Sequence, residues 1–114
     1  MSAITSHVLD TAVGRPAVDL GVRLDVLEPD GAFRTVAERA TDAGGRVADL
    51  LPAGSRLEAR TYRLVFATGA YFEARALPVF YPRVEVIFTV LAPGEHHHVP
   101  LLLSPFGYST YRGT

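Results

Sequence analysis

The sequence predicts an all-β fold, a sandwich or barrel built from seven or eight short strands. Apolar and polar residues alternate along several short segments, as they do in a strand that buries one face. Glycine, proline and aspartate interrupt these segments at intervals of roughly 8–12 residues, which is the turn spacing of all-β domains. Because no internal repeat, linker or low-complexity stretch divides the chain, residues 1–114 are expected to form a single domain.

Alternation is clearest in the first half of the chain. In residues 17–27 every second position from Val18 to Val26 is apolar, and most of the positions between them are charged. After a turn, residues 33–41 resume the alternation, so the two segments are expected to pair as a hairpin. A short strand is expected at residues 4–10, before this hairpin.

The second half adds further strands and one helix. Residues 84–91 carry the strongest strand signal, because β-branched and aromatic residues dominate them. Residues 69–77 contain fair helix formers and are followed by Pro78, which would end a helix. The remaining predicted strands are residues 57–66, 97–103 and 107–111.

The chain is short and unusually apolar for its size. A domain of 114 residues buries only about two-thirds of the surface that its unfolded chain exposes. Nevertheless, 48% of the residues are hydrophobic and the mean hydropathy is +0.18. Part of the apolar surface is therefore expected to lie in a contact between copies of the chain.

Composition excludes several classes of function. All 11 basic residues are arginines, so neither Schiff-base chemistry nor a P-loop lysine is available. Without cysteine there can be no disulfide, thiolate metal site or cysteine nucleophile. A net charge of −1 with no basic stripe argues against nucleic acid as a partner. The absence of a leader pattern and of a membrane-spanning apolar run predicts a cytoplasmic protein that does not associate with membranes.

Histidines are the first candidates for chemistry. Three of the four stand together as His96-His97-His98, and alternation places His96 and His98 on one face and His97 on the other. Such a triplet could be a solvated strand end that is merely rich in histidine, or it could supply two metal ligands. Zinc would then need a third ligand, either His7 or a carboxylate brought in by the fold. His7 lies in the predicted N-terminal strand, on the same face as Thr5.

Arginine and tyrosine supply the other candidates. Arg46 follows two glycines, so a tight turn would aim its guanidinium either into solvent or at an anionic or carbonyl-rich ligand. The end of the chain contains Tyr108, Tyr111 and Arg112. Two aromatic rings and a planar cation suit the recognition of a flat heterocycle, although tyrosines in a terminal strand can also serve for packing alone.

Four segments together resemble the signature blocks of 5-hydroxyisourate hydrolases in the transthyretin-like family. They are Ser6-His7-Val8-Leu9-Asp10, Thr41-Asp42 through Gly45-Arg46, His96-His97-His98-Val99-Pro100-Leu101-Leu102, and Tyr108-Ser109-Thr110-Tyr111-Arg112-Gly113. The resemblance covers essentially the whole chain. The combination of the N-terminal H-V-L-D and the C-terminal Y-R-G is far more specific than any single block.

The resemblance implies a fold, an assembly and a reaction. The fold is the prealbumin-like β-sandwich, with two four-stranded sheets and one short helix. The assembly is a homotetramer, a dimer of dimers with active sites in a central channel. The reaction is the hydrolysis of 5-hydroxyisourate to 2-oxo-4-hydroxy-4-carboxy-5-ureidoimidazoline in urate degradation, with no cofactor and no metal.

Roles for individual residues also follow from the resemblance. His7, Arg46 and His98 match the family's catalytic positions, with one histidine taking a proton from water and the other protonating the leaving nitrogen. Arg46 would bind the substrate and stabilise the oxyanion. Which histidine is the base stays open.

The C-terminal motif Tyr111-Arg112-Gly113 is implied in the site as well. Tyr111 and Arg112 would bind substrate together with His7 and Arg46. Thr114 stands where the family usually has serine, and it keeps the hydroxyl that would orient substrate or water.

Two alternatives remain. Transthyretin itself uses the same fold as a non-catalytic carrier of small hydrophobic ligands. The polar set of His7, Arg46 and His98 favours the hydrolase, because a carrier of apolar ligands would not line its channel with several ionisable groups. Zinc binding through His96, His98 and His7 is possible as a side property.

Overall fold

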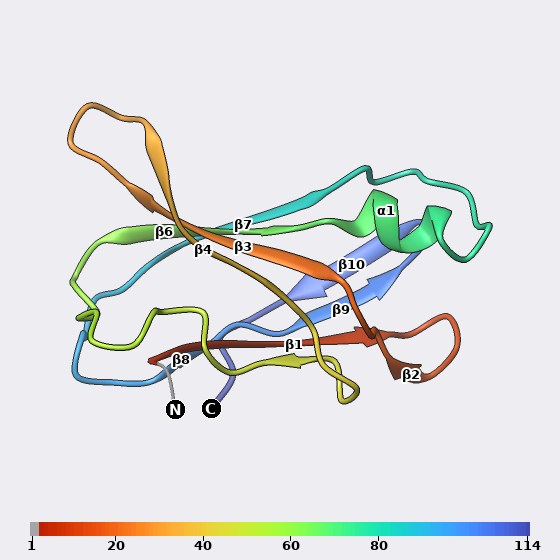
Figure 1. Ribbon diagram of the computed structural model, residues 1–114, viewed down its shortest axis with the longest axis horizontal. Helices are drawn as coiled ribbons and strands as arrows, with labels where there is room; N and C mark the ends of the chain where they lie inside the picture. The colour runs from red at the N-terminus through yellow and green to blue at the C-terminus, as the bar shows by residue number, and fades with distance from the viewer. Residues whose placement is uncertain (1–2) are drawn as a thin grey trace.

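The computed structural model describes residues 3–114, and in it two β-sheets pack face to face with one short helix at one end of the sandwich (Figure 1). The first sheet contains four antiparallel strands in the order β4 (Phe33–Ala40), β3 (Gly21–Leu27), β6 (Thr61–Phe66) and β7 (Val84–Thr89). Helix α1 (Thr68–Glu73) follows β6 after a single residue. This arrangement confirms the predicted hairpin, and of the two predicted architectures, sandwich and barrel, it is the sandwich.

The second sheet is organised around β1 (Ile4–Asp10). Its main order is β10 (Gly107–Thr110), β9 (Leu101–Ser104), β1 and β2 (Arg15–Pro16). Two further short strands, β5 (Arg46–Val47) and β8 (His97–His98), pair with the first half of β1. The sheet therefore has six strands and not the four that the family resemblance implies, because β1 changes partner along its length.

The core lies between the two sheets, and alternation identifies much of it correctly. Leu20, Val22, Leu24 and Val26 are all at most 2% exposed. Val18 is an exception, with 39% of its surface exposed. The predicted strand at residues 17–27 begins only at Gly21. Val18 therefore precedes β3, and the alternation of that strand does not determine whether Val18 is buried.

A β-bulge between β3 and β4 also departs from the simple pattern. Leu24 lies opposite Ala37 and Asp25 lies opposite Thr35, which leaves Val36 as the extra residue. Strict alternation would place Val36 on the outer face with the charged residues. Instead, Val36 packs against the core and the next residue, Ala37, is only 6% exposed. The extra residue in the bulge breaks the alternation, so two consecutive side chains of β4 lie on the core side.

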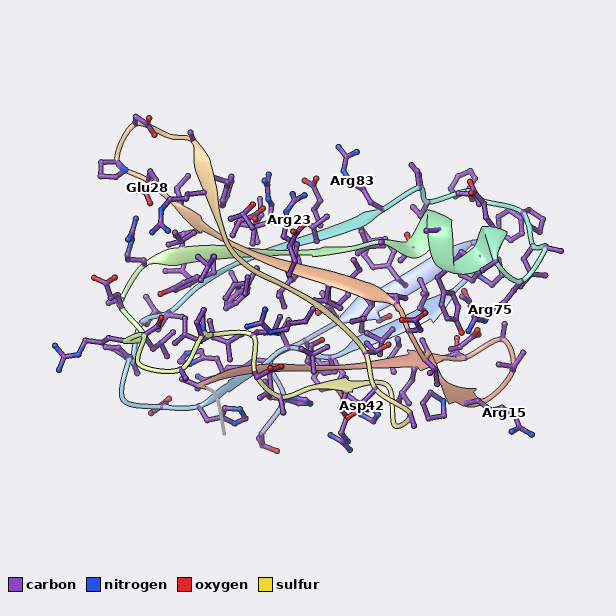
Figure 2. All side chains as sticks on the ribbon, viewed as in Figure 1. Arg15, Arg23, Glu28, Asp42, Arg75 and Arg83 are labelled. Atoms are coloured by element: carbon purple, nitrogen blue, oxygen red, sulfur yellow. The ribbon has the colours of Figure 1, made fainter. Side chains whose placement is uncertain are left out.

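Asp25 lies on the outer face of the first sheet, as predicted, yet it is only 1% exposed. Arginines cover it: Arg23 and Arg63 donate to its carboxylate at 3.0 and 2.9 Å, and Thr35 donates at 3.1 Å. Burial alone would raise the pKa of Asp25, but these hydrogen bonds hold it below its ordinary value. Figure 2 shows Arg23 on this outer face.

Helix α1 is shorter than predicted. It ends at Glu73 instead of continuing to residue 77, and Pro78 is not what stops it. The N–H groups of Leu77 and Ala76 bond back to the carbonyls of Phe72 and Glu73, both at 3.0 Å, and Ala76 adopts φ 55°. This is the hydrogen-bond pattern of a Schellman ending, with alanine in the left-handed position that glycine usually fills.

Other predicted boundaries shift for local reasons. The strand expected at residues 57–66 begins at Thr61, and the strand expected at residues 84–91 ends at Thr89. The strand expected at residues 97–103 is divided into β8 and β9, because Pro100 has no N–H for the ladder. No helix within residues 3–114 is long and apolar enough to cross a membrane.

The end of β1 is anchored to the helix. The hydroxyl of Tyr71 donates to Oδ2 of the buried Asp10 at 2.8 Å. Burial and the neighbouring carboxylate raise the pKa of Tyr71 to about 12, so this hydroxyl remains a donor throughout the physiological range. The contact ties β1, which carries His7, to the opposite layer of the sandwich.

Candidate active site

Three neighbouring strands bring four of the polar side chains to one face. In the β1–β5 pair His7 lies opposite Arg46, and in the β1–β8 pair Thr5 lies opposite His98. Directly opposed residues project to the same side of a sheet, and residues two apart on one strand do so too. Thr5, His7, Arg46 and His98 therefore share a face, although 91 residues separate His7 from His98 in sequence (98 − 7).

The turn before β5 fixes Arg46. Oδ1 of Asp42 accepts hydrogen bonds from the backbone N–H groups of Gly44 and Arg46, each at 2.9 Å. These bonds, that of Arg46 foremost, lower the pKa of Asp42, so the carboxylate stays ionised and holds the turn. Figure 2 shows Asp42 on this turn, at the second sheet and far from Arg23.

Gly45 allows the turn to lie against β1. It has φ +74°, and a Cβ at this position would come within 2.4 Å of the carbonyl oxygen of Val8. The carbonyl of Gly45 in turn accepts a hydrogen bond from the N–H of Val8 at 2.8 Å. The two glycines that precede Arg46 in the sequence thus have a physical role in placing it.

His7 is held by the same turn. Its Nε2 lies 2.9 Å from the carbonyl oxygen of Gly44. Because a carbonyl oxygen can only accept, Nε2 of His7 carries a proton in this contact. His7 and Arg46 are therefore positioned together by residues 42–46.

The histidine triplet divides as alternation predicts. The rings of His96 and His98 stack with centroids 6.3 Å apart and an interplanar angle of 28°. Both rings reach the hydroxyl of Thr5, through Nε2 of His96 at 2.9 Å and Nδ1 of His98 at 2.7 Å. His97 points to the other side, is only 4% exposed, and donates from Nδ1 to the carbonyl of Glu95 at 2.9 Å.

His98 is in an environment that disfavours its protonated form. Burial lowers the pKa of His98 from its ordinary value, and the charges of His96, Arg46 and His7 lower it further. The imidazole is consequently neutral over a wider range of pH than a free histidine. His98 is thus available in its unprotonated form, the form that can accept a proton, near neutral pH.

A cavity of about 330 Å³ opens at this face. The polar residues that line it are Thr5, Ser6, Arg46, His96, His98 and Thr114. Its size is comparable with the small end of ligand pockets, and its lining combines a cation, imidazoles and hydroxyls. The candidate site is this cavity together with His7, which lies opposite Arg46 on the neighbouring strand.

The end of the chain reaches the cavity through Gly113. Its N–H donates to the carbonyl of His98 at 2.7 Å, and the two residues form an antiparallel bridge. Thr114 follows this bridge and lines the cavity.

Tyr111 and Arg112 lie elsewhere in the single chain. They line a second cavity, of about 260 Å³, together with Phe88, His97 and Val99. Arg112 donates to Glu95 at 2.9 Å. Of the six predicted site residues, His98, Arg46 and Thr114 line one cavity, and His7 lies opposite Arg46 on the neighbouring strand. Tyr111 and Arg112 line the other cavity.

Sequence reasoning did not single out Thr5, although the alternation of β1 places it on the face of His7. For His96 the sequence suggests only a solvated strand end or a metal ligand. Within residues 3–114 there is no group of three or more histidine, cysteine, aspartate or glutamate residues arranged to hold a metal ion. In the structure, Thr5 lies between the two rings and uses one nitrogen of each.

Comparison with known proteins assigns the family. A family model described as "HIUase/Transthyretin family" matches residues 4–113, and the chain belongs to this family. A 5-hydroxyisourate hydrolase of Caulobacter vibrioides is 48% identical over 119 residues, with 100% of both chains covered. These matches agree with the resemblance that the four sequence segments indicate.

Solved structures agree with the fold. The 5-hydroxyisourate hydrolase of Klebsiella pneumoniae is 34% identical and superimposes with a TM-score of 0.83, covering 97% of this chain and 98% of that one. Sea bream transthyretin in complex with thyroxine is 29% identical and has a TM-score of 0.91, covering 99% and 96%. The transthyretin-like fold is therefore shared by a hydrolase and by a protein that binds thyroxine, and the fold alone does not separate the two functions.

Proposed function

We propose that this protein hydrolyses 5-hydroxyisourate to 2-oxo-4-hydroxy-4-carboxy-5-ureidoimidazoline, a step of urate degradation. The observation that carries the proposal is the pairing of a neutral imidazole, His98, with a permanent cation, Arg46, at one small cavity. The hydrolases of the same family, 48% identical to this chain in one case, support the choice of substrate.

His98 is the proposed general base. Its pKa is lowered, and within the described residues 3–114 its Nε2 makes no hydrogen bond, so this nitrogen is free to face a water molecule. As the water oxygen attacks the ring carbonyl carbon, Nε2 takes one proton from it. The resulting tetrahedral species carries negative charge on the former carbonyl oxygen.

His7 is the proposed acid. In the structure its Nε2 carries a proton, which is donated to the carbonyl of Gly44. Collapse of the tetrahedral species breaks the bond between the carbonyl carbon and the ring nitrogen, and the nitrogen needs a proton as it leaves. In its doubly protonated form His7 supplies this proton from Nδ1, directly or through water, while Nε2 stays on the Gly44 carbonyl. The hydroxyl left from the attacking water then loses its proton to solvent, and the former carbonyl becomes the carboxylate of the product.

Arg46 has two effects in this scheme. Its guanidinium cannot lose its charge, so it stabilises the oxyanion as negative charge develops. The same positive charge lowers the pKa of His98 and keeps that ring neutral before the reaction. Thr114, which lines the same cavity, orients substrate or water through its hydroxyl.

We further propose that the chain assembles as a homotetramer, a dimer of dimers. Exposed aromatic rings support an assembly: Phe80 and Phe106 are 60% and 66% exposed, with ring centroids 5.7 Å apart. Tyr81 and Tyr108 extend this cluster at 5.1 Å. For Tyr111 and Arg112 to contact substrate, a neighbouring copy must complete the cavity, or Arg112 must leave Glu95.

The alternative function is that of a non-catalytic carrier, and the similarity to sea bream transthyretin favours it as the second candidate. The polar lining of the cavity weighs against it. An apolar ligand would have to desolvate Arg46 and two imidazoles without satisfying their hydrogen bonds, which costs free energy.

The decisive test follows freshly generated 5-hydroxyisourate by its absorbance, with and without the protein. We expect decay faster than the spontaneous reaction and proportional to protein concentration. Spontaneous decay at an unchanged rate, with tight binding of thyroxine measured by calorimetry, would support the carrier instead.

A further inference from the structure

The hydroxyl of Thr5 lies between two imidazole rings. Its Oγ1 is 2.7 Å from Nδ1 of His98 and 2.9 Å from Nε2 of His96, both within hydrogen-bond distance. Thr5 is only 6% exposed, whereas His96 is exposed. Its place opposite His98 in the β1–β8 ladder holds the three groups together.

A hydroxyl group carries a single proton, and this limits the protonation states of the two rings. If Thr5 donates to His96, it can accept from His98, whose Nδ1 then carries the proton and whose Nε2 has a free lone pair. If Thr5 donates to His98, a neutral His98 carries its proton on Nε2 and cannot take another there. If both rings donate, neither of them accepts the proton of Thr5.

The surroundings favour the first arrangement. Arg46 on β5 and His7 on β1 both disfavour positive charge on His98, and a lone pair is more stable than an N–H group near a fixed cation. Arg112 reaches the carbonyl of His96 at 3.5 Å, and its charge is paired with that of Glu95 at 2.9 Å. His96, being exposed, can keep its own proton on Nδ1 and donate it to water.

We propose that Thr5 is a positioning residue that donates its proton to His96 and thereby holds His98 with Nδ1 protonated and Nε2 unprotonated. The proposal rests on the proposed function, in which Nε2 of His98 takes the proton of water. Thr5 and His96 do not touch the reacting atoms. They select the form of His98 that can act as a base, as the partner of an imidazole does in other hydrolases.

The arrangement of protons can be measured without substrate. We suggest NMR of the full-length protein with 15N-labelled histidine near pH 8, because the nitrogen shifts distinguish the two neutral forms of each ring. In the wild type, His98 should carry its proton on Nδ1. In Thr5→Val, which removes the hydroxyl at nearly constant volume, His98 should move towards the Nε2-protonated form that imidazoles prefer in water. Thr5→Ser should retain the wild-type form.

A second pair of variants tests the acceptor. His96→Gln keeps an oxygen that can accept from Thr5 and should preserve the form of His98. His96→Leu removes the acceptor, so Thr5 should turn its proton to His98 and reproduce the effect of Thr5→Val. His97→Gln, on the other side of the strand, is the matched control and should leave His98 unchanged.

Kinetics supply the functional readout. We expect Thr5→Val to lower kcat by roughly 10²-fold, the lower end of the range for a positioned acid or base, with little change in KM. Thr5→Ser should restore most of the rate. The proposal is overturned if wild-type His98 carries its proton on Nε2, or if Thr5→Val leaves the form of His98 unaltered. If His98 has the expected form but the protein does not hydrolyse 5-hydroxyisourate, the role of Thr5 stands and the proposed function fails.

Discussion

Gly113 packs directly against the imidazole of His98. A Cβ at position 113 would lie 2.7 Å from Cδ2 of the ring, while the N–H of Gly113 donates to the carbonyl of His98 at 2.7 Å. The tail and the ring are thus fitted to each other, and any side chain at position 113 must displace one of them.

Replacement of Gly113 by alanine should therefore lower kcat by roughly 10²-fold, because a shift of the order of 1 Å in a catalytic group has an effect of this size. Thermal unfolding should change little, since residue 113 is partly exposed. Gly107→Ala is the matched control: its Cβ would meet Oγ of Ser104 at 3.6 Å, an ordinary contact. Similar rates in both variants would show that the ring is not constrained by the tail.

Gly45→Ala should destabilise the fold through two separate effects. The positive φ costs about 1–2 kcal/mol for a residue with a Cβ, and the contact with the carbonyl of Val8 adds a steric cost of similar size. Gly54 has φ +81° with open space around it, so Gly54→Ala measures the backbone effect alone. Chemical denaturation should give a larger loss for Gly45→Ala than for Gly54→Ala. Equal losses would mean that the turn can move away from β1.

The rate should depend on pH in a way that follows from His98. A base must be unprotonated, so kcat/KM falls as pH drops through the pKa of His98. Because burial, His96, Arg46 and His7 lower this pKa from 6.5, the acid limb should lie below pH 6.5. Arg46→Gln removes a positive charge and should move the limb to higher pH, in addition to lowering the rate.

Initial rates between about pH 5 and 8, corrected for spontaneous decay, would measure this shift. The free energy of unfolding depends on pH in the same direction. His98 binds its proton more readily in the unfolded chain than in the folded protein, so the stability that the neutral ring contributes is lost as pH falls from 6.5 through the lowered pKa of His98. An acid limb in Arg46→Gln at a lower pH than in the wild type would contradict the electrostatic account of His98.

Light scattering should give the mass of a homotetramer at micromolar concentration. Phe106, which is 66% exposed, belongs to the aromatic cluster proposed to be covered in the assembly. Phe106→Ser should weaken the assembly, whereas Phe106→Tyr should preserve it. A wild-type protein that stays monomeric at this concentration would contradict the proposed assembly.

The sequence predicts the parts of the site that follow from alternation. The division of the histidine triplet, and the face shared by Thr5 and His7, both follow from a period of two along a strand. The proximity of His7 to Arg46 and of Thr5 to His98 cannot be predicted from alternation, because it depends on which strands pair and in which register. That register is set by the whole sandwich, and the family resemblance was needed to anticipate it.

Where the sequence misleads, the reason is local backbone geometry. The bulge at Val36 turns this side chain to the core side of β4, against the alternation. Helix α1 ends with Ala76 in a left-handed conformation, which the sequence does not indicate because alanine rarely adopts it. Nothing in the sequence distinguishes Thr5 from other strand threonines, because the contact of both imidazoles with its hydroxyl depends on the fold.

The central claim is that the cavity of His98 and Arg46 is where the ring of 5-hydroxyisourate is opened. The most direct measurement compares the rates of His98→Ala and His97→Ala with that of the wild type, each corrected for spontaneous decay. His98→Ala should lower kcat by roughly 10²–10⁴-fold with the assembly intact, as expected for loss of a positioned base, and His97→Ala should have a far smaller effect. Equal losses in the two variants would contradict the claim, because residues on opposite faces of β8 would then be equally important.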